Sequence, residues 1–167
     1  MSGITSDANI LIDHARLTCQ RYQYAYQEPM PVEQLVQTLC NLKQSYTQHG
    51  GMRPFGCSFL VAGWDRVYGF QLYQTDPSGN YGGWKATCIG ANSSTAQGIF
   101  KSDYPDEGFA LAEAKKMLFK VLTKTTESTT LSGERCKLSA GVMERNICSH
   151  RLSALLLTSR SGRDPAE

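Results

Sequence analysis

The chain has almost no excess of charge and no long apolar run, and these two absences exclude several classes of protein. Lysine and arginine number 17 and aspartate and glutamate 15, which leaves a formal net charge of +2. That excess is too small to indicate nucleic acid or an anionic membrane as a partner. No apolar run approaches the roughly 20 residues needed to cross a bilayer, and the N-terminal residues lack the basic and apolar blocks of a signal peptide. We therefore expect no nucleic-acid partner and no membrane association.

Cysteine and histidine are also sparse, and neither follows a ligand pattern. The six cysteines contain no Cys-x-x-Cys pair, and the three histidines are scattered. A zinc site and a disulfide framework both need closer and more regular spacing. We therefore expect thiols buried in a reducing compartment and no metal or other cofactor. What the chain does have is 167 residues, 41% of them hydrophobic, which is enough for one globular domain with its own core.

The first third of the chain has the spacing of two helices. Apolar side chains recur every three or four residues over 7–27 and again over 31–48, which is typical of one buried helical face. Ser6 is the expected N-cap of the first helix, with Asp7 at the positive end of the helix dipole. Prolines separate the two helices, and Gly50-Gly51 is expected to end the second one in a left-handed conformation.

The middle of the chain changes to strand patterns. Residues 55–64 are almost continuously apolar, which predicts a strand buried on both faces. Residues 68–75 alternate between apolar and polar side chains, and 81–90 follow as a third strand. Two further helices are predicted over 93–104 and 109–126, and two further strands over 136–144 and 151–158. Strands grouped together and helices grouped apart indicate an α+β fold with antiparallel sheet covered by helices.

The glycine-rich stretch DPSGNYGGWKATCIGAN at 76–92 allows three interpretations. A phosphate-binding P-loop ends in Gly-Lys-Ser/Thr before a helix, but here Trp84 separates Gly83 from Lys85 and a strand pattern follows. A nucleophilic Lys85 needs an activating partner, and the sequence shows no nucleophile paired with a base. The third interpretation is a hairpin turn, because Asp76-Pro77-Ser78-Gly79 has the residues that a type I turn favours at each position. We predict that turn, followed by a bulge or close backbone approach at Gly82-Gly83.

Four segments together resemble the alpha-type subunits of the 20S proteasome. They are GITSDANILIDHARL at 3–17, YTQHGGMRPFG at 46–56, GWDRVYGFQLYQTDPSG at 63–79 and NYGGWKATCIG at 80–90. Arg-Pro-Phe-Gly, the Asp-Pro-Ser-Gly hairpin and Trp-Lys-Ala form a specific combination. The resemblance extends over residues 3–127, fades beyond 128 and is greatest to the type 4 group of eukaryotes, which is similar around Gly82-Gly83 and Cys88-Ile89-Gly90.

This resemblance implies a fold and a role. The fold is a partial four-layer αββα sandwich of the N-terminal-nucleophile hydrolase type, in which helix pairs flank two antiparallel sheets. The role is a non-catalytic structural subunit of the outer alpha ring, which restricts access to the proteasome core in ubiquitin-dependent protein breakdown. The implied partners are other alpha subunits in a heptameric ring, beta-ring subunits and unfolded polypeptide passing the channel. The implied location is cytoplasmic and nuclear.

The resemblance also assigns residues to structural positions, with no catalytic, cofactor-binding or metal-binding residue among them. Arg53 and Phe55 are expected to fix a turn at the channel annulus to the body of the subunit, and His49 stands where the family usually has an aromatic residue. The expected annulus segment is His49, Gly50, Gly51, Arg53, Pro54, Phe55 and Gly56. The expected structural hairpin consists of Asp76, Pro77, Ser78 and Gly79, together with Trp84.

Two departures from the family pattern leave other interpretations open. We expect residues 1–146 to form a partial alpha-type domain without the gating tail, first helix and first strands that the family places before Gly3. Residues 147–167 are expected to form a divergent C-terminal tail. Missing strand partners would leave apolar edges and make the chain marginally stable. The alternatives are a truncated isoform that does not assemble or that sequesters ring partners and, less favoured, a threonine-type peptidase subunit, which needs an exposed N-terminal threonine.

Overall fold

The structure is a computed structural model that describes residues 1–105 and 110–125. Helices and antiparallel strands both occur in it, as the α+β prediction required. In chain order the elements are β1 (Ser2–Gly3), α1 (Thr5–Tyr26), α2 (Val32–Gln48), β2 (Cys57–Asp65), β3 (Gly69–Thr75), β4 (Tyr81–Gly83), α3 (Ser93–Asp103) and α4 (Leu111–Thr125). The strands predicted over 136–144 and 151–158, and the divergent tail, lie outside the described residues.

The four strands form one antiparallel sheet in the order β1-β2-β3-β4. The long β2–β3 hairpin pairs seven residues of each strand, from Phe59 opposite Thr75 to Asp65 opposite Gly69. The short strand β1, which the sequence analysis did not predict, pairs only with the start of β2, at Ser58 and Cys57.

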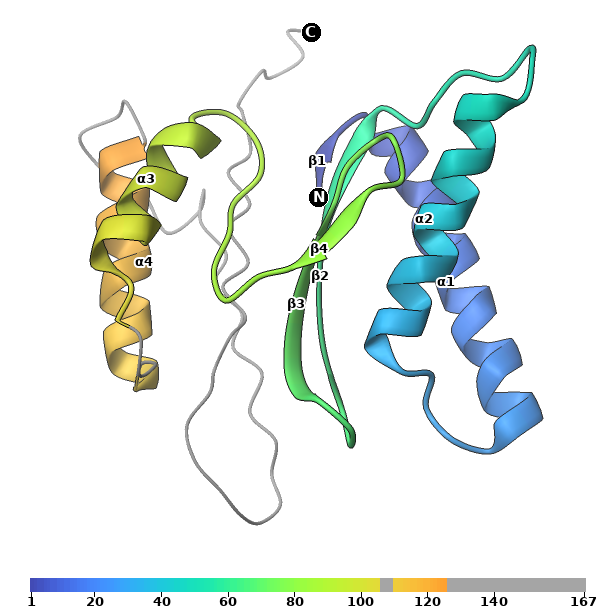
Figure 1. Cartoon of the computed structure of the whole chain (residues 1–167), viewed down its shortest axis with the longest axis horizontal. Helices are drawn as coiled ribbons and strands as arrows, with labels where there is room; N and C mark the ends of the chain where they lie inside the picture. The colour runs from blue at the N-terminus through green and yellow to red at the C-terminus, as the bar shows by residue number, and fades with distance from the viewer. Residues whose placement is uncertain (106–109, 126–167) are drawn as a thin grey trace, which may run out of the picture.

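The two helix pairs lie on opposite sides of this sheet (Figure 1). Helices α1 and α2 pack on one face, and α3 and α4 pack on each other beyond the opposite face. Each pair has its own apolar cluster. The cluster under α1 and α2 contains Ala8, Leu11, Phe55, Cys57 and Phe59. The cluster between α3 and α4 contains Cys88, Ala96, Phe100, Met117, Leu118 and Val121.

The helices match the predicted spans closely, but their ends differ from the prediction. Ile4 is the N-cap of α1, so Ser6 lies inside the helix and the predicted Ser6 cap is wrong. The backbone N–H of Ile4 bonds the Gly56 carbonyl at 2.9 Å, which fixes the extended residue just before the helix begins. Helix α2 ends at an extended His49, and the left-handed residue follows only at Gly51, with φ of 83°.

Two strand predictions need correction. The strand predicted over 55–64 begins at Cys57, and its far half is only partly buried, with Trp64 exposed, because it approaches the exposed turn at 66–68. The strand predicted over 81–90 ends at Gly83. No bulge occurs at the two glycines, since Gly82 and Gly83 pair regularly with β3. The chain then leaves the sheet after a last bond from the Trp84 N–H to the Leu72 carbonyl.

Candidate functional site

The segment that joins α2 to β2 is exposed except at its end. Residues 49–54 are all exposed, whereas Phe55 is buried. A Cβ atom added at Gly50 or Gly51 would meet no atom within 4 Å. The main chain at these two glycines therefore faces open space, and the segment projects from the molecule at the end of α2.

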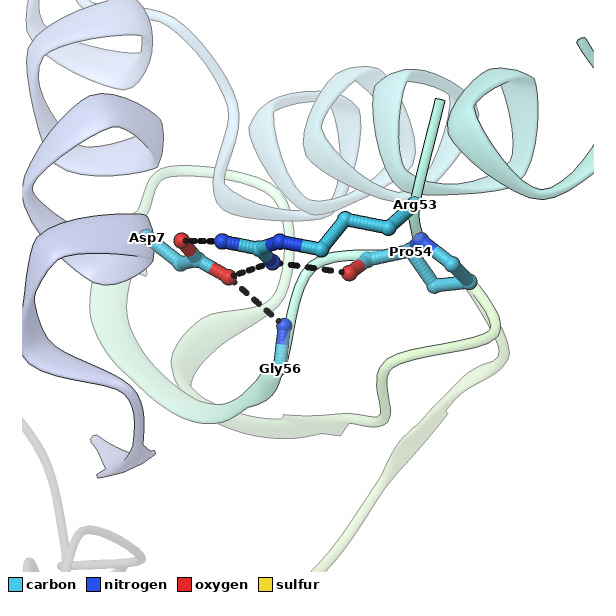
Figure 2. A network of polar contacts seen from close by, with 4 residues as sticks. All are labelled: Asp7, Arg53, Pro54 and Gly56. Atoms are coloured by element: carbon cyan, nitrogen blue, oxygen red, sulfur yellow. Dashed lines mark hydrogen bonds and ion pairs between the residues drawn. The ribbon is translucent and has the colours of Figure 1, made fainter. Parts of the chain in front are cut away.

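An ion pair ties this exposed segment to the start of α1 (Figure 2). The Arg53 guanidinium donates two hydrogen bonds to the Asp7 carboxylate, at 2.6 and 2.9 Å. The Gly56 N–H donates a third bond to the same carboxylate at 2.9 Å. The Arg53 hydrogen bonds and then the Gly56 bond lower the pKa of Asp7 to about 2, although burial alone would raise it. Asp7 therefore remains ionised and holds both ends of the turn.

Close packing fixes the buried end of the same segment. The Phe55 ring lies 4.4 Å from the Tyr46 ring, centroid to centroid, and belongs to the cluster under α1 and α2. A Cβ on Gly56 would lie 2.6 Å from Ile4 Cδ1, and a Cβ on Gly3 would lie 2.2 Å from the Gly56 carbonyl oxygen. The pairing of β1 with β2 thus requires glycine at position 3, where φ is 121° and the clash is with backbone, whereas a side chain at position 56 would displace the exposed Ile4 side chain.

His49 has a different role from that of a packed aromatic residue. Its ring is exposed, and Nδ1 lies 2.6 Å from the Ser45 carbonyl oxygen in the last turn of α2. The same carbonyl accepts the His49 backbone N–H at 3.3 Å, so His49 contacts the end of α2 through both its main chain and its ring.

The second predicted segment forms the loop between β3 and β4. The Asp76 carboxylate accepts bonds from the Ser78 N–H at 3.0 Å, the Ser78 hydroxyl at 2.6 Å and the Asn80 N–H at 3.0 Å. The Gly79 N–H bonds the Asp76 carbonyl at 3.3 Å, and Gly79 has φ of 91°. The loop is therefore closed by its own aspartate. Trp84 lies beyond β4 and outside this loop, and Lys85 beside it is exposed.

Sequence reasoning missed Lys43, which connects α2 to β2, to β3 and to the predicted hairpin at Asp76. Its side chain is 0% exposed, and Nζ donates to the Cys57 carbonyl at 3.1 Å, the Thr75 hydroxyl at 2.9 Å and the Asp76 carbonyl at 3.2 Å. The ammonium also lies 4.9 Å from the centre of the Phe59 ring. Burial lowers the pKa of Lys43, against the opposing effect of Cys57, Cys40 and Asp76.

A signal for this residue was present in the helical spacing. Lys43 lies four residues after Leu39 and seven after Val36, both of which are buried. Side chains at these intervals share one helical face. The pattern thus placed a lysine on the apolar face of α2, while its acceptors come from segments that are distant in sequence.

The polar side chains of this region hold the exposed segments to the helices and the sheet. Among the residues that the structure describes, every buried side-chain nitrogen or oxygen has a hydrogen-bond partner. Within the same residues, no group of three histidine, cysteine or acidic side chains lies close enough to hold a metal ion.

Burial raises the pKa of Cys40, Cys57 and Cys88, which favours the neutral thiols. No helix in the described part of the chain is long and apolar enough to span a membrane.

Comparisons with known proteins agree on one family. A family profile described as proteasome subunit matches residues 1–140. Proteasome subunit alpha type-4 of Spinacia oleracea and alpha type-4-A of Arabidopsis thaliana are each 61% identical over 139 residues, which covers 83% of this chain and 55% of theirs. Proteasome subunit alpha type-4 of Petunia hybrida is 52% identical over 173 residues, covering 100% of this chain and 69% of its own. The chain thus spans about half the length of the first two relatives.

Proposed function

The chain belongs to the proteasome subunit family, and from this premise we propose that it is a non-catalytic structural subunit of the outer alpha ring of the 20S core. The observation that carries the proposal is the 61% identity to proteins named alpha type-4 subunits. The partners we propose are other alpha subunits in a heptameric ring, the beta-ring subunits and unfolded polypeptide in the channel. The proposed location is cytoplasmic and nuclear.

We infer that residues 49–56 contribute to the channel annulus. Three features support this role: the segment is exposed, Gly50 and Gly51 add no side-chain bulk, and the Arg53–Asp7 pair anchors it. A passing polypeptide would then meet main chain held in a fixed position rather than a loose loop. The Asp76 loop, linked through Lys43, supports the same end of α2 from the sheet side.

We also propose that the described elements are part of a four-layer αββα sandwich. The α1–α2 pair and the sheet supply two of its layers, and the α3–α4 pair supplies an outer layer on the other side of the sheet. In this proposal residues 1–146 belong to the alpha-type domain and 147–167 form a separate tail.

The same reasoning favours a non-catalytic subunit over a threonine peptidase. Thr5 is the threonine nearest the N-terminus, and it is the first residue of α1. A peptidase of this class needs threonine at the mature N-terminus, where its own amine activates the hydroxyl. Thr5 is preceded by β1 and Ile4, which pair with β2 and Gly56.

A tagged copy of the chain, expressed in plant cells and separated on a native gel, tests the proposal. We expect the tag to migrate with beta subunits and with peptidase activity. The matched variants are Arg53→Ala, which removes the anchor, and Arg16→Ala, which removes an exposed ion pair. Migration only as free chain, aggregate or small complexes with alpha subunits would reject the ring role and favour the isoform that does not assemble.

A further inference from the structure

Helix α1 has a row of exposed apolar side chains on the side that is turned away from the sheet. Ile10, Leu17 and Tyr24 are 57%, 49% and 86% exposed. They recur every seven residues, which is close to two helical turns, so they lie in one line along the helix. Ala8 and Leu11 are buried and belong to the other side of α1, which packs on α2 and β2. We call Ile10, Leu17 and Tyr24 the outer stripe.

Two exposed charges of opposite sign flank the outer stripe at equal distances from its centre. Asp13 comes four residues before Leu17, and Arg21 comes four residues after it. A helix turns about 100° per residue, so these two side chains lie on opposite flanks of the stripe. Asp13 contacts Arg16 at 3.4 Å, but both side chains are highly exposed, and such a pair contributes little. Among the residues that the structure describes, Arg21 has no ion pair.

The order of these side chains about Leu17 fits a second copy of the same helix. A two-fold axis beside Leu17, perpendicular to α1, pairs two copies antiparallel. Residues equally far from Leu17 then lie at the same height, so Ile10 meets the second copy's Tyr24, and Leu17 meets its own counterpart. Asp13 comes to the height of the second copy's Arg21, whose long side chain can cross the stripe to it. The symmetry makes this charge pair occur twice.

A parallel pair of α1 helices loses this agreement. It would set Asp13 against the second copy's Asp13 and Arg21 against the second copy's Arg21, and like charges that face each other repel. A partner of unrelated sequence has no reason to match both the spacing of the stripe and the order of the two charges. The antiparallel pair of two copies is therefore the arrangement that joins apolar to apolar and acid to base at the same time.

We propose that the outer stripe is a self-association surface, on which α1 helices of two copies of this chain pack antiparallel with Leu17 at the axis. Asp13 and Arg21 cross between the copies and set the register. The stripe spans 14 residues of helix, or about 21 Å, which makes a small interface. The dimer is therefore weak and depends on concentration. It goes beyond the proposed ring function and does not require it.

Sedimentation of the purified full chain between about 1 and 300 µM tests the dimer. We expect an equilibrium between monomer and dimer over this range. Leu17→Asp brings two carboxylates together at the axis and should weaken the dimer by at least about tenfold. Val67→Asp is the control, because it changes an apolar side chain that is 74% exposed in the β2–β3 turn, and it should leave the equilibrium unchanged. Circular dichroism checks that both variants are folded.

An exchange of the two charges distinguishes the symmetric pair from any other use of α1. Asp13→Arg alone sets arginine against the second copy's Arg21, and Arg21→Asp alone sets aspartate against the second copy's Asp13. Each single variant should therefore dimerise more weakly than the native chain. An equimolar mixture of the two variants restores both pairs of opposite charge, so its mixed dimer should be tighter than the dimer of either variant alone. A fluorophore on one variant lets sedimentation measure the mixed dimer.

A cysteine at the axis gives a covalent measurement of the same geometry. Leu17→Cys should cross-link with its own counterpart under mild oxidation, because the axis brings the two thiols together. Asn9→Cys is the matched control, since position 9 is also exposed on α1. Its two copies would lie about 24 Å apart along the paired helices, so it should cross-link no faster than the native chain.

Four results would overturn the proposal. They are a monomer at every concentration, a dimer that Leu17→Asp leaves unchanged, a mixture of charge variants that is no tighter than the separate variants, and equal cross-linking at positions 9 and 17. If the chain stays monomeric and Leu17→Asp instead removes beta subunits from the tagged chain on a native gel, the outer stripe is a contact with the ring and not with a second copy.

Discussion

At the scale of single residues, a buried carboxylate and a buried ammonium organise the region around the end of α2. Asp7 binds Arg53 and Gly56, and Lys43 binds one residue at the start of β2 and two at the end of β3. The two buried charges differ in whether an opposite charge neutralises them. Asp7 has a guanidinium partner, whereas the hydrogen-bond acceptors of Lys43 are all neutral. The charged form is therefore the stabilising form of Asp7, whereas charge on Lys43 opposes its burial.

The Asp7 carboxylate should stabilise the fold above its titration range. Its native pKa of about 2 lies below the value of about 3.9 for an unfolded aspartate. The contribution is therefore fully present above about pH 4 and is lost as pH falls through about 2. We expect Asp7→Asn to lower the melting temperature by a constant amount near neutral pH and by progressively less toward pH 2. A pH series of thermal melts measures this, with Asp13→Asn as the exposed control. A gap that does not shrink in acid would contradict the role of Asp7.

Lys43 should also make stability rise with pH, but in the alkaline range. Burial lowers its native pKa, so above that pKa and up to about 10.4 the unfolded state binds more protons and folding gains stability as pH rises. Lys43→Met leaves the three acceptors without their donor and should lower the free energy of unfolding by about 1–3 kcal/mol at pH 7. Urea unfolding at several pH values should show this deficit growing toward pH 10. The exposed Lys116→Met is the control, and a deficit that declines with rising pH would refute the assignment.

At the scale of elements, the β3–β4 loop and α2 fit together through a glycine. A Cβ on Gly79 would lie 2.6 Å from the Cys40 carbonyl oxygen and 3.0 Å from the Gln44 backbone nitrogen. The loop therefore rests directly on the α2 backbone, and Lys43 binds it from between these two residues. Side-chain bulk at position 79 would separate the sheet from the helix.

A matched pair of glycine substitutions isolates this contact. Gly79 and Gly69 both have positive φ, at 91° and 69°, but only Gly79 has atoms within 4 Å of an added Cβ. Gly69→Ala should lower the free energy of unfolding by about 1 kcal/mol through backbone strain alone. Gly79→Ala should lower it by roughly 1–3 kcal/mol more, because helix and loop must move apart. Chemical denaturation of both variants measures the difference, and equal losses would show that the loop does not press on α2.

At the scale of the whole molecule, the two apolar clusters share no residue. One lies under α1 and α2 and includes residues of β2, and the other lies between α3 and α4. In the described part of the chain, the irregular segment after β4 connects the sheet and its α1–α2 layer to the α3–α4 pair. A protein built this way need not open as one unit.

Native-state hydrogen exchange should therefore reveal two opening events. We expect amides of α4 to become exposed at lower denaturant than amides of β3, since β3 has a strand on each side and, among the elements that the structure describes, α4 packs mainly on α3. Mass spectrometry of peptides from 69–75 and 111–125 gives the two opening free energies. A single shared value for both segments would show instead that the clusters are coupled.

The sequence by itself determined the local features of this protein. Helical periodicity defined α1, α2, α3 and α4 to within two residues at each end, because each helix satisfies its backbone internally and needs only a consistent face. Alternation located β3, and the residues at 76–79 favoured a turn where the structure has a bond from Gly79 to Asp76. The quoted motifs were enough to indicate the family.

Only the tertiary structure decided the features that join distant segments. Asp7 and Arg53 lie 46 residues apart, and no local pattern pairs them. The start of α1, the early end of β4 and the short strand β1 depend on which backbone groups meet across the sheet. Lys43 shows the reason most directly. Helical spacing placed it on the buried face. The atoms that accept hydrogen bonds from its ammonium group belong to Cys57, Thr75 and Asp76, and these residues meet around it only in the folded chain.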